Sequence, residues 1–127
     1  TWYTSTPIGT AQKIANLFQA QTGIRAKLAQ NLRGVVSQRL VPHKGGQSRV
    51  VACEVMTVSA LAREYILDPL KLKELADLIR KGTVAEGMMS FDASLLDLYR
   101  KGEIGEETAL QHATSPTDLK LKLTGFA

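Results

Sequence analysis

A basic segment between residues 33 and 56 groups side chains that could bind an anion. Five of its side chains are basic or histidine, and Glu54 is its single carboxylate. The five are Arg33, Arg39, His43, Lys44 and Arg49. Guanidinium and ammonium groups bind phosphates and carboxylates. Because a glycine pair, Gly45-Gly46, separates two apolar runs, the segment is a candidate anion-binding hairpin.

The same charge bias covers the N-terminal part of the chain. Residues 1–53 contain seven Lys or Arg and no Asp or Glu, whereas residues 54–127 contain nine basic and twelve acidic side chains. A stretch of this length without carboxylates favours a surface that faces phosphate, nucleic acid or an acidic protein. A solvated basic face without a special role explains the same composition, and both interpretations stay open.

The sequence lacks the motifs of a self-contained enzyme. Gly45-Gly46 is not a P-loop, because no Gly-Lys-Ser/Thr follows it, and no Gly-x-Ser-x-Gly motif is present. His43 and His112 have no metal-ligand spacing. Cys53 is the only cysteine, which excludes an internal disulfide, and we expect it to be a small buried hydrophobic residue. No catalytic or metal-binding residue is therefore assigned.

Nucleic acid is the weaker of the anionic partners. Trp2, Tyr3 and Phe18 are the aromatic residues of the basic N-terminal part, and none of them lies among the basic side chains of residues 33–56. Stacking on bases therefore has little support, and only a contact to phosphates stays open. Nucleic acid is not the expected partner.

Helices are expected on both sides of this hairpin. Proline after a capping residue, apolar residues at helical spacing and a terminal glycine predict the helix boundaries. The expected helices cover residues 7–22, 24–32, 61–66, 69–81, 91–101, 106–112 and 116 onwards, and the expected strands cover residues 38–41 and 49–56. Val35 and Val36 fit either the end of the second helix or the start of a strand. The class is α+β and mostly helical.

The length suits one compact domain or two small subdomains. The sequence contains no run of 18 apolar residues and no charged-then-apolar leader at its N-terminus, so we expect neither a membrane span nor a signal peptide. A cytoplasmic protein is the expectation.

Two long stretches carry a family resemblance. "LAQNLRGVVSQRLVPHKGGQSRVVACEVM" is similar to a motif of type IV pilus retraction ATPases, the PilT/PilU branch of the secretion ATPases, in which a helix ends in L-R-G-[VI]-[VI]-S-Q-R-L-[LV]-P. "GMMSFDASLLDLYRKGEIGEETALQHATSPTDLKLKL" resembles the G-M-x-T-[MF]-D segment of that family, with Asp92 at the acidic position. The resemblance covers nearly the whole chain.

The resemblance implies a fold and a parent protein. Residues 1–56 would be the last helices and terminal β-hairpin of a RecA-like P-loop ATPase domain, and residues 57–127 a helical C-terminal subdomain. The parent would be a homo-hexameric motor that uses ATP and Mg²⁺ and acts at the inner-membrane base of the type IV pilus in twitching motility. Because Walker A and Walker B motifs are missing here, we expect this chain to be inactive alone, with no cofactor bound.

Two sets of site residues follow from the resemblance. Arg33, Gln38 and Arg39 would lie at the edge of the nucleotide domain and stabilise that end of the sheet. Tyr3 stands where the family has the histidine of its T-L-H-T-N-S box, so phosphate sensing by that box is not carried over.

The second set falls on the family motif A-I-R-N-L-I-R-E, which corresponds to residues 61–68. Arg63, Ile66 and Asp68 would form an exposed surface used in retraction, although Leu67 stands in the place of an arginine. The alternative is that Ile66 and Tyr65 only pack the subdomain.

A different class of function also fits the composition. The chain could be a stand-alone basic adaptor that binds nucleic acid or an acidic protein. Loss of binding at high salt would mark such a phosphate binder.

Overall fold

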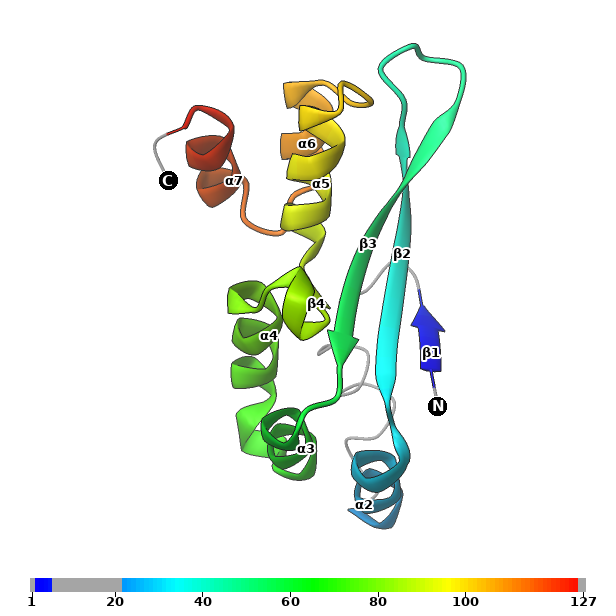
Figure 1. Cartoon of the computed structure of the whole chain (residues 1–127), viewed down its shortest axis with the longest axis vertical. Helices are drawn as coiled ribbons and strands as arrows, with labels where there is room; N and C mark the ends of the chain where they lie inside the picture. The colour runs from blue at the N-terminus through cyan, green and yellow to red at the C-terminus, as the bar shows by residue number, and fades with distance from the viewer. Residues whose placement is uncertain (1, 6–21, 126–127) are drawn as a thin grey trace. The chain divides into compact units, whose positions relative to one another are not determined.

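A computed structural model describes residues 2–5 and 22–125 of the chain, and the helix expected over residues 7–22 lies outside them except for its last residue. Most of the described residues are helical, and four strands form one sheet (Figure 1). The strands are β1 (Trp2–Ser5), β2 (Gly34–Pro42), β3 (Arg49–Thr57) and β4 (Met88–Met89). The α-helices are α2 (Thr22–Asn31), α3 (Ala60–Leu67), α4 (Leu72–Lys81), α5 (Phe91–Arg100), α6 (Glu106–His112) and α7 (Pro116–Leu123), with short 3-10 helices η1 (Pro69–Lys71) and η2 (Val84–Glu86). The predicted mixed, mostly helical class is confirmed.

The sheet is built around the predicted hairpin. Its strand order is β1-β2-β3-β4. β1 runs parallel to β2, with Trp2 opposite Gly34, and β4 runs antiparallel to β3, with Met56 opposite Met88. At the turn, the His43 N–H donates to the Ser48 carbonyl over 2.9 Å. The two-residue strand β4 was not predicted, because two residues are too few to show an alternating pattern.

The end of α2 settles the ambiguity at Val35 and Val36. The helix stops at Asn31 and β2 begins at Gly34, so both valines belong to the strand. Val35 is buried, and β-branched side chains favour strands, where they pack well on the pleated surface. The hairpin is therefore longer than residues 38–41 alone predict.

The described residues divide into two compact units. Unit 1 holds the residues up to Gln38 together with Glu54–Met89, and unit 2 holds Arg39–Cys53 with Ser90 onwards. Each hairpin strand therefore runs through both units. The boundary expected between residues 56 and 57 is not a border between the units, and the assignment of residues 1–56 to a nucleotide domain stays a prediction.

Unit 1 has its own apolar core between its helices and its part of the sheet. Leu75 and Ile79 lie one turn apart on α4 and both are buried, as expected for the inner face of an amphipathic helix. The buried members are Ala29, Leu32, Val35, Met56, Val58, Ala62, Ile66, Leu75, Ile79 and Met88.

Unit 2 packs α5, α6 and α7 with the turn half of the hairpin. Its buried members are Val41, Ala52, Phe91, Leu95, Leu98, Ile104, Ala109 and Leu119. Cys53 is only half-buried, so the prediction of a buried residue is wrong. Its backbone N–H donates to the Oγ atom of buried Ser94 over 3.0 Å, and partial burial raises the pKa of its thiol.

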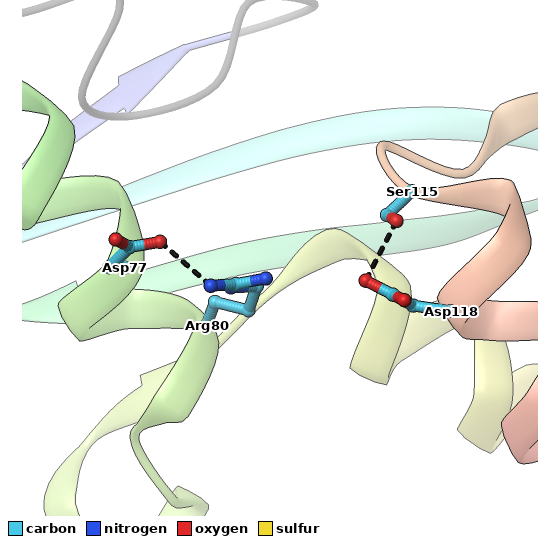
Figure 2. A network of polar contacts seen from close by, with 4 residues as sticks. All are labelled: Asp77, Arg80, Ser115 and Asp118. Carbon is cyan, nitrogen blue, oxygen red and sulfur yellow. Dashed lines mark hydrogen bonds and ion pairs between the residues drawn. The ribbon is translucent and has the colours of Figure 1, made fainter. Parts of the chain in front are cut away.

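Several predicted helix starts are confirmed in detail. The Oγ atom of Ser90 accepts a hydrogen bond from the Ala93 N–H over 3.1 Å, which caps α5. Asp68 caps η1 by accepting from the Leu70 N–H over 2.9 Å. Ser115 occupies the capping position of α7, but its hydroxyl donates to the Asp118 carboxylate over 2.9 Å (Figure 2).

Candidate functional site

Arg63, predicted to belong to an exposed retraction surface, contacts helix α2. Its side chain is half-buried. Its Nη1 atom donates to the Gln30 carbonyl over 3.1 Å and also to the Ala29 carbonyl. The guanidinium therefore binds the last turn of the neighbouring helix, where carbonyls lack partners within the helix.

Ile66 is buried with no exposed area. The expectation that it contributes to an exposed surface is wrong, because it packs in the core of unit 1 with Ala62 and Leu75. The alternative, in which Ile66 packs the subdomain, describes its position. Asp68 is half-buried, and its carboxylate accepts from the Leu70 N–H at the junction of α3 and η1.

The solvent-exposed residues of this segment include three leucines beside polar Glu64 and Lys71. The exposed fractions are 42% for Leu61, 50% for Leu67 and 88% for Leu70. Leu67 was visible in the sequence as the residue in place of an arginine. An exposed face of this kind carries apolar side chains where a partner protein could bury them.

The residues predicted for the nucleotide-domain edge differ in their surroundings. The Arg39 guanidinium lies 4.6 Å from the centre of the Phe91 ring, and its Nη1 atom donates to the His112 carbonyl over 2.7 Å. Within unit 2 it therefore joins β2 to α5 and α6. Arg33 and Gln38 have exposed side chains, and the Arg33 carbonyl accepts from the Val58 N–H over 2.9 Å.

The turn of the basic segment uses its own polar groups to hold its shape. The Nδ1 atom of His43 accepts from the Gly45 N–H over 2.9 Å, and Gly46 has a φ of 80°. The Lys44 N–H donates to the Glu103 carbonyl over 2.8 Å. His43 is thus part of the turn, and its Nδ1 atom is used within it.

The structural roles of two polar side chains were not predicted. Arg25 is 2% exposed, and its Nη1 atom donates to the Ile66 carbonyl over 3.0 Å. Its position four residues before buried Ala29 places it on the inner face of α2, which was the available signal. Asp92 accepts from two backbone N–H groups of the loop before α7, at Thr114 and Ser115.

Surface ion pairs add little here. Figure 2 shows the pair between Asp77 and Arg80, one turn apart on α4 with 2.9 Å between Oδ1 and Nη2. A second pair joins Asp97 to Lys101 on α5 over 2.7 Å, and this contact raises the pKa of Lys101. All four side chains are well exposed, and solvent screening leaves such pairs with little effect on stability.

Within residues 2–5 and 22–125, no group of three or more His, Cys, Asp or Glu side chains could hold a metal ion. None of the helices described there is long and apolar enough to cross a lipid bilayer.

Known proteins resemble this chain in sequence. It is 40% identical over 96 residues to the type IV pilus ATPase PilU of Pseudomonas aeruginosa, an alignment that covers 76% of this chain and 25% of PilU. It is 30% identical over 118 residues to the PilT retraction ATPase of the same organism, covering 91% of this chain and 33% of PilT. A twitching motility protein of Neisseria gonorrhoeae is 30% identical over 115 residues, covering 89% of the chain and 30% of that protein. No family model matches the chain.

Solved structures resemble it in fold. The crystal structure of the pilus retraction motor PilT with bound ADP matches with a TM-score of 0.68 and 30% identity, covering 93% of this chain and 32% of that one. The Legionella pneumophila ATPase DotB matches with a TM-score of 0.64 at 20% identity, covering 94% and 30%, and shows the fold alone.

The chain spans between a quarter and a third of the length of these sequence relatives. Both the sequence and the fold point to the same family of proteins. The chain has the sequence and the fold of the C-terminal part of a PilT/PilU-like type IV pilus ATPase.

Proposed function

We propose that the chain is the C-terminal part of a hexameric motor ATPase that powers type IV pilus retraction and twitching motility. The observation that carries this proposal is the 40% identity to PilU over 96 residues, with a matching fold in the ADP-bound retraction motor PilT. In this proposal residues 1–56 complete a RecA-like nucleotide domain and residues 57–127 form the helical C-terminal subdomain. The motor works in the cytoplasm at the inner membrane, where its partners are proteins of the pilus base.

ATP and Mg²⁺ belong to the rest of the motor in this proposal. Residues 1–127 contain no Gly-Lys-Ser/Thr loop that could surround phosphates. Arg33 and Gln38, both exposed, are then the residues that face the remainder of the nucleotide domain. The 127-residue chain alone is expected neither to bind ATP tightly nor to hydrolyse it.

Helix α3 and η1 form the proposed retraction surface, with the roles of its residues revised. Arg63 and Asp68 shape the segment through their bonds to α2 and to the Leu70 N–H. Ile66 holds α3 in place through its packing in the core of unit 1. The exposed leucines, Leu67 and Leu70 above all, are then the side chains that a pilus-base protein would cover.

The first experiment is to read the open reading frame upstream of Thr1. The proposal requires a Gly-x-x-x-x-Gly-Lys-Ser/Thr loop and a magnesium-binding carboxylate on a strand in that frame. A start codon next to Thr1 would defeat it and favour the basic adaptor, which a salt-dependent nucleic-acid titration would then examine.

The second experiment uses the full-length protein. Substitutions Leu67→Asp and Leu70→Asp are expected to abolish twitching while ATP hydrolysis stays within about twofold of wild type, since exposed substitutions seldom disturb folding. Val84→Asp is the matched control, because Val84 is 72% exposed on η2 and lies outside the surface. Twitching by the leucine variants would contradict the proposed surface but not the motor.

A further inference from the structure

Two arginines join helices α2 and α3 in opposite directions. Arg25 of α2 donates through Nη1 to the carbonyl of Ile66, in the last turn of α3, over 3.0 Å. Arg63 of α3 donates to the carbonyls of Ala29 and Gln30, in the last turn of α2. Each guanidinium therefore lies at the C-terminal end of the other helix.

A cation is favoured at both helix ends. The last four carbonyls of a helix have no partner within the helix, and the helix dipole favours positive charge there. Neither α2 nor α3 has a basic residue in its own last turn. Each helix therefore receives from its neighbour the cation that its own sequence does not supply.

Burial of the Arg25 side chain is unfavourable for the free energy of folding. It is 2% exposed, and its Nη2 atom has no hydrogen-bond partner in the described part of the chain. A buried charge with an unsatisfied donor opposes folding, and an apolar side chain of similar volume often packs as well or better. The volume of Arg25 alone therefore does not account for its place in the core, whereas its bond to the Ile66 carbonyl gives it a specific role.

The contact between α2 and α3 lies where the hairpin ends. α2 leads into β2 within three residues, and β3 leads into α3 within three residues. The Val58 N–H donates to the Arg33 carbonyl at this point, just beyond the paired strands. The position of α3 on α2 is therefore set next to the end of the hairpin.

We propose that Arg25 and Arg63 act together as a clasp that fixes where α3 lies on α2. Both are positioning residues: they hold a helix in place rather than contact a partner. This inference goes beyond the proposed function, because it concerns how the chain holds α3, and its test needs neither ATP nor a pilus.

The test compares amide hydrogen exchange in the full-length protein and in its variants. Arg25→Met and Arg63→Met each remove one side of the clasp and keep an unbranched apolar stem. Each is expected to speed exchange of the amides of α2 and α3 by about tenfold or more, as for the loss of a hydrogen bond to a charged group. Amides of α5 and α7 should keep their wild-type rates, and Arg80→Met, which removes an exposed arginine of unit 1, should leave α3 unchanged.

The double variant decides whether the two arginines work as one device. If they do, losing the second adds little once the first is gone, and exchange in α3 rises by no more than about threefold over the faster single variant. If the fold-change in the double variant equalled the product of the two single fold-changes, the two bonds would be independent and the clasp would be wrong. Wild-type exchange in either single variant would also overturn the clasp.

A lysine series keeps the test decisive if a methionine variant does not fold. Lysine retains the charge but donates from a single point, without the planar fork of arginine. Arg25→Lys and Arg63→Lys are each expected to speed exchange in α3 by about threefold or more. Wild-type rates in both would show that any cation serves, and the arginine clasp would be wrong.

Discussion

The Oδ2 atom of Asp92 accepts a hydrogen bond of 2.9 Å from the backbone N–H of Ser115. Oδ1 of the same carboxylate accepts one of 2.7 Å from the Thr114 N–H. A side chain in the first turn of α5 thus holds the loop between α6 and α7. The acidic position of the G-M-x-T-[MF]-D segment consequently has a structural reason in this fold.

Replacing Asp92 should destabilise unit 2. Asp92→Ala removes two hydrogen bonds to a charged acceptor and leaves the two backbone N–H groups without that carboxylate. We expect a loss of about 2–3 kcal/mol in the free energy of unfolding, measured by urea denaturation. Asp97→Ala, on the same helix, breaks only the exposed pair with Lys101 and should cost about 0.5 kcal/mol or less. Equal losses would show that the contact with the loop is unimportant.

Gly87 should be among the glycines of the chain least able to accept a side chain. Its φ is +75°, and a Cβ there would overlap the Oγ1 atom of Thr57. The N–H and the hydroxyl of Thr57 both donate to the Gly87 carbonyl over 3.0 Å. Gly87→Ala is expected to cost about 2–4 kcal/mol, from backbone strain together with displacement of Thr57. Gly102→Ala has a similar φ, +78°, with no atom near its Cβ, and should cost only about 1–2 kcal/mol. Thermal unfolding followed by circular dichroism compares the two.

The capping box of η2 should depend on pH. The Glu86 carboxylate accepts from the backbone N–H of Thr83 over 2.8 Å and from its hydroxyl over 3.0 Å. These bonds lower the pKa of Glu86 below its ordinary value of 4.5. Because folding lowers the pKa of Glu86, the cap is complete at pH values above the ordinary Glu pKa. The cap is lost as the pH falls through the lowered pKa.

An NMR titration of the Thr83 amide measures this midpoint. It should fall below the ordinary Glu value, and Glu86→Gln should remove the transition. A midpoint at or above 4.5 would contradict the cap.

Arg39 should matter for stability and Arg33 should not. Arg39→Ala loses the stacking on Phe91 and the bond to the His112 carbonyl, for an expected cost of about 2 kcal/mol in the free energy of unfolding. Arg33→Ala removes the same charge from an exposed position and should change stability by about 0.5 kcal/mol or less. Guanidinium denaturation of both variants is the measurement. A larger loss for Arg33 would reverse the assigned roles.

Local chemistry made much of the fold predictable. Ser90 and Asp68 were recognisable as caps because their short polar side chains precede apolar residues at helical spacing, and both accept the expected backbone N–H. The strand from Arg49 was predicted from its apolar run after a glycine turn. These features depend on residues close together in the sequence.

The site was harder to predict, because exposure depends on which neighbours a side chain meets. The motif comparison placed Ile66 on a surface, but Ala62 and Leu75 bury it in the core. Arg25 has no local signal beyond its helical spacing, since the carbonyl it bonds belongs to a residue 41 positions further along. Contacts over that sequence distance are set by tertiary packing.

The division of the chain into units restricts how it can be cut. The backbone passes from one unit to the other after Gln38, after Cys53 and after Met89. A protease that cut the hairpin turn would leave all three of these covalent connections intact. A deletion from either terminus would strip residues from one unit while leaving part of it behind. A gene for unit 2 alone would need residues 39–53 joined directly to residue 90, so neither unit is encoded by one continuous stretch of sequence.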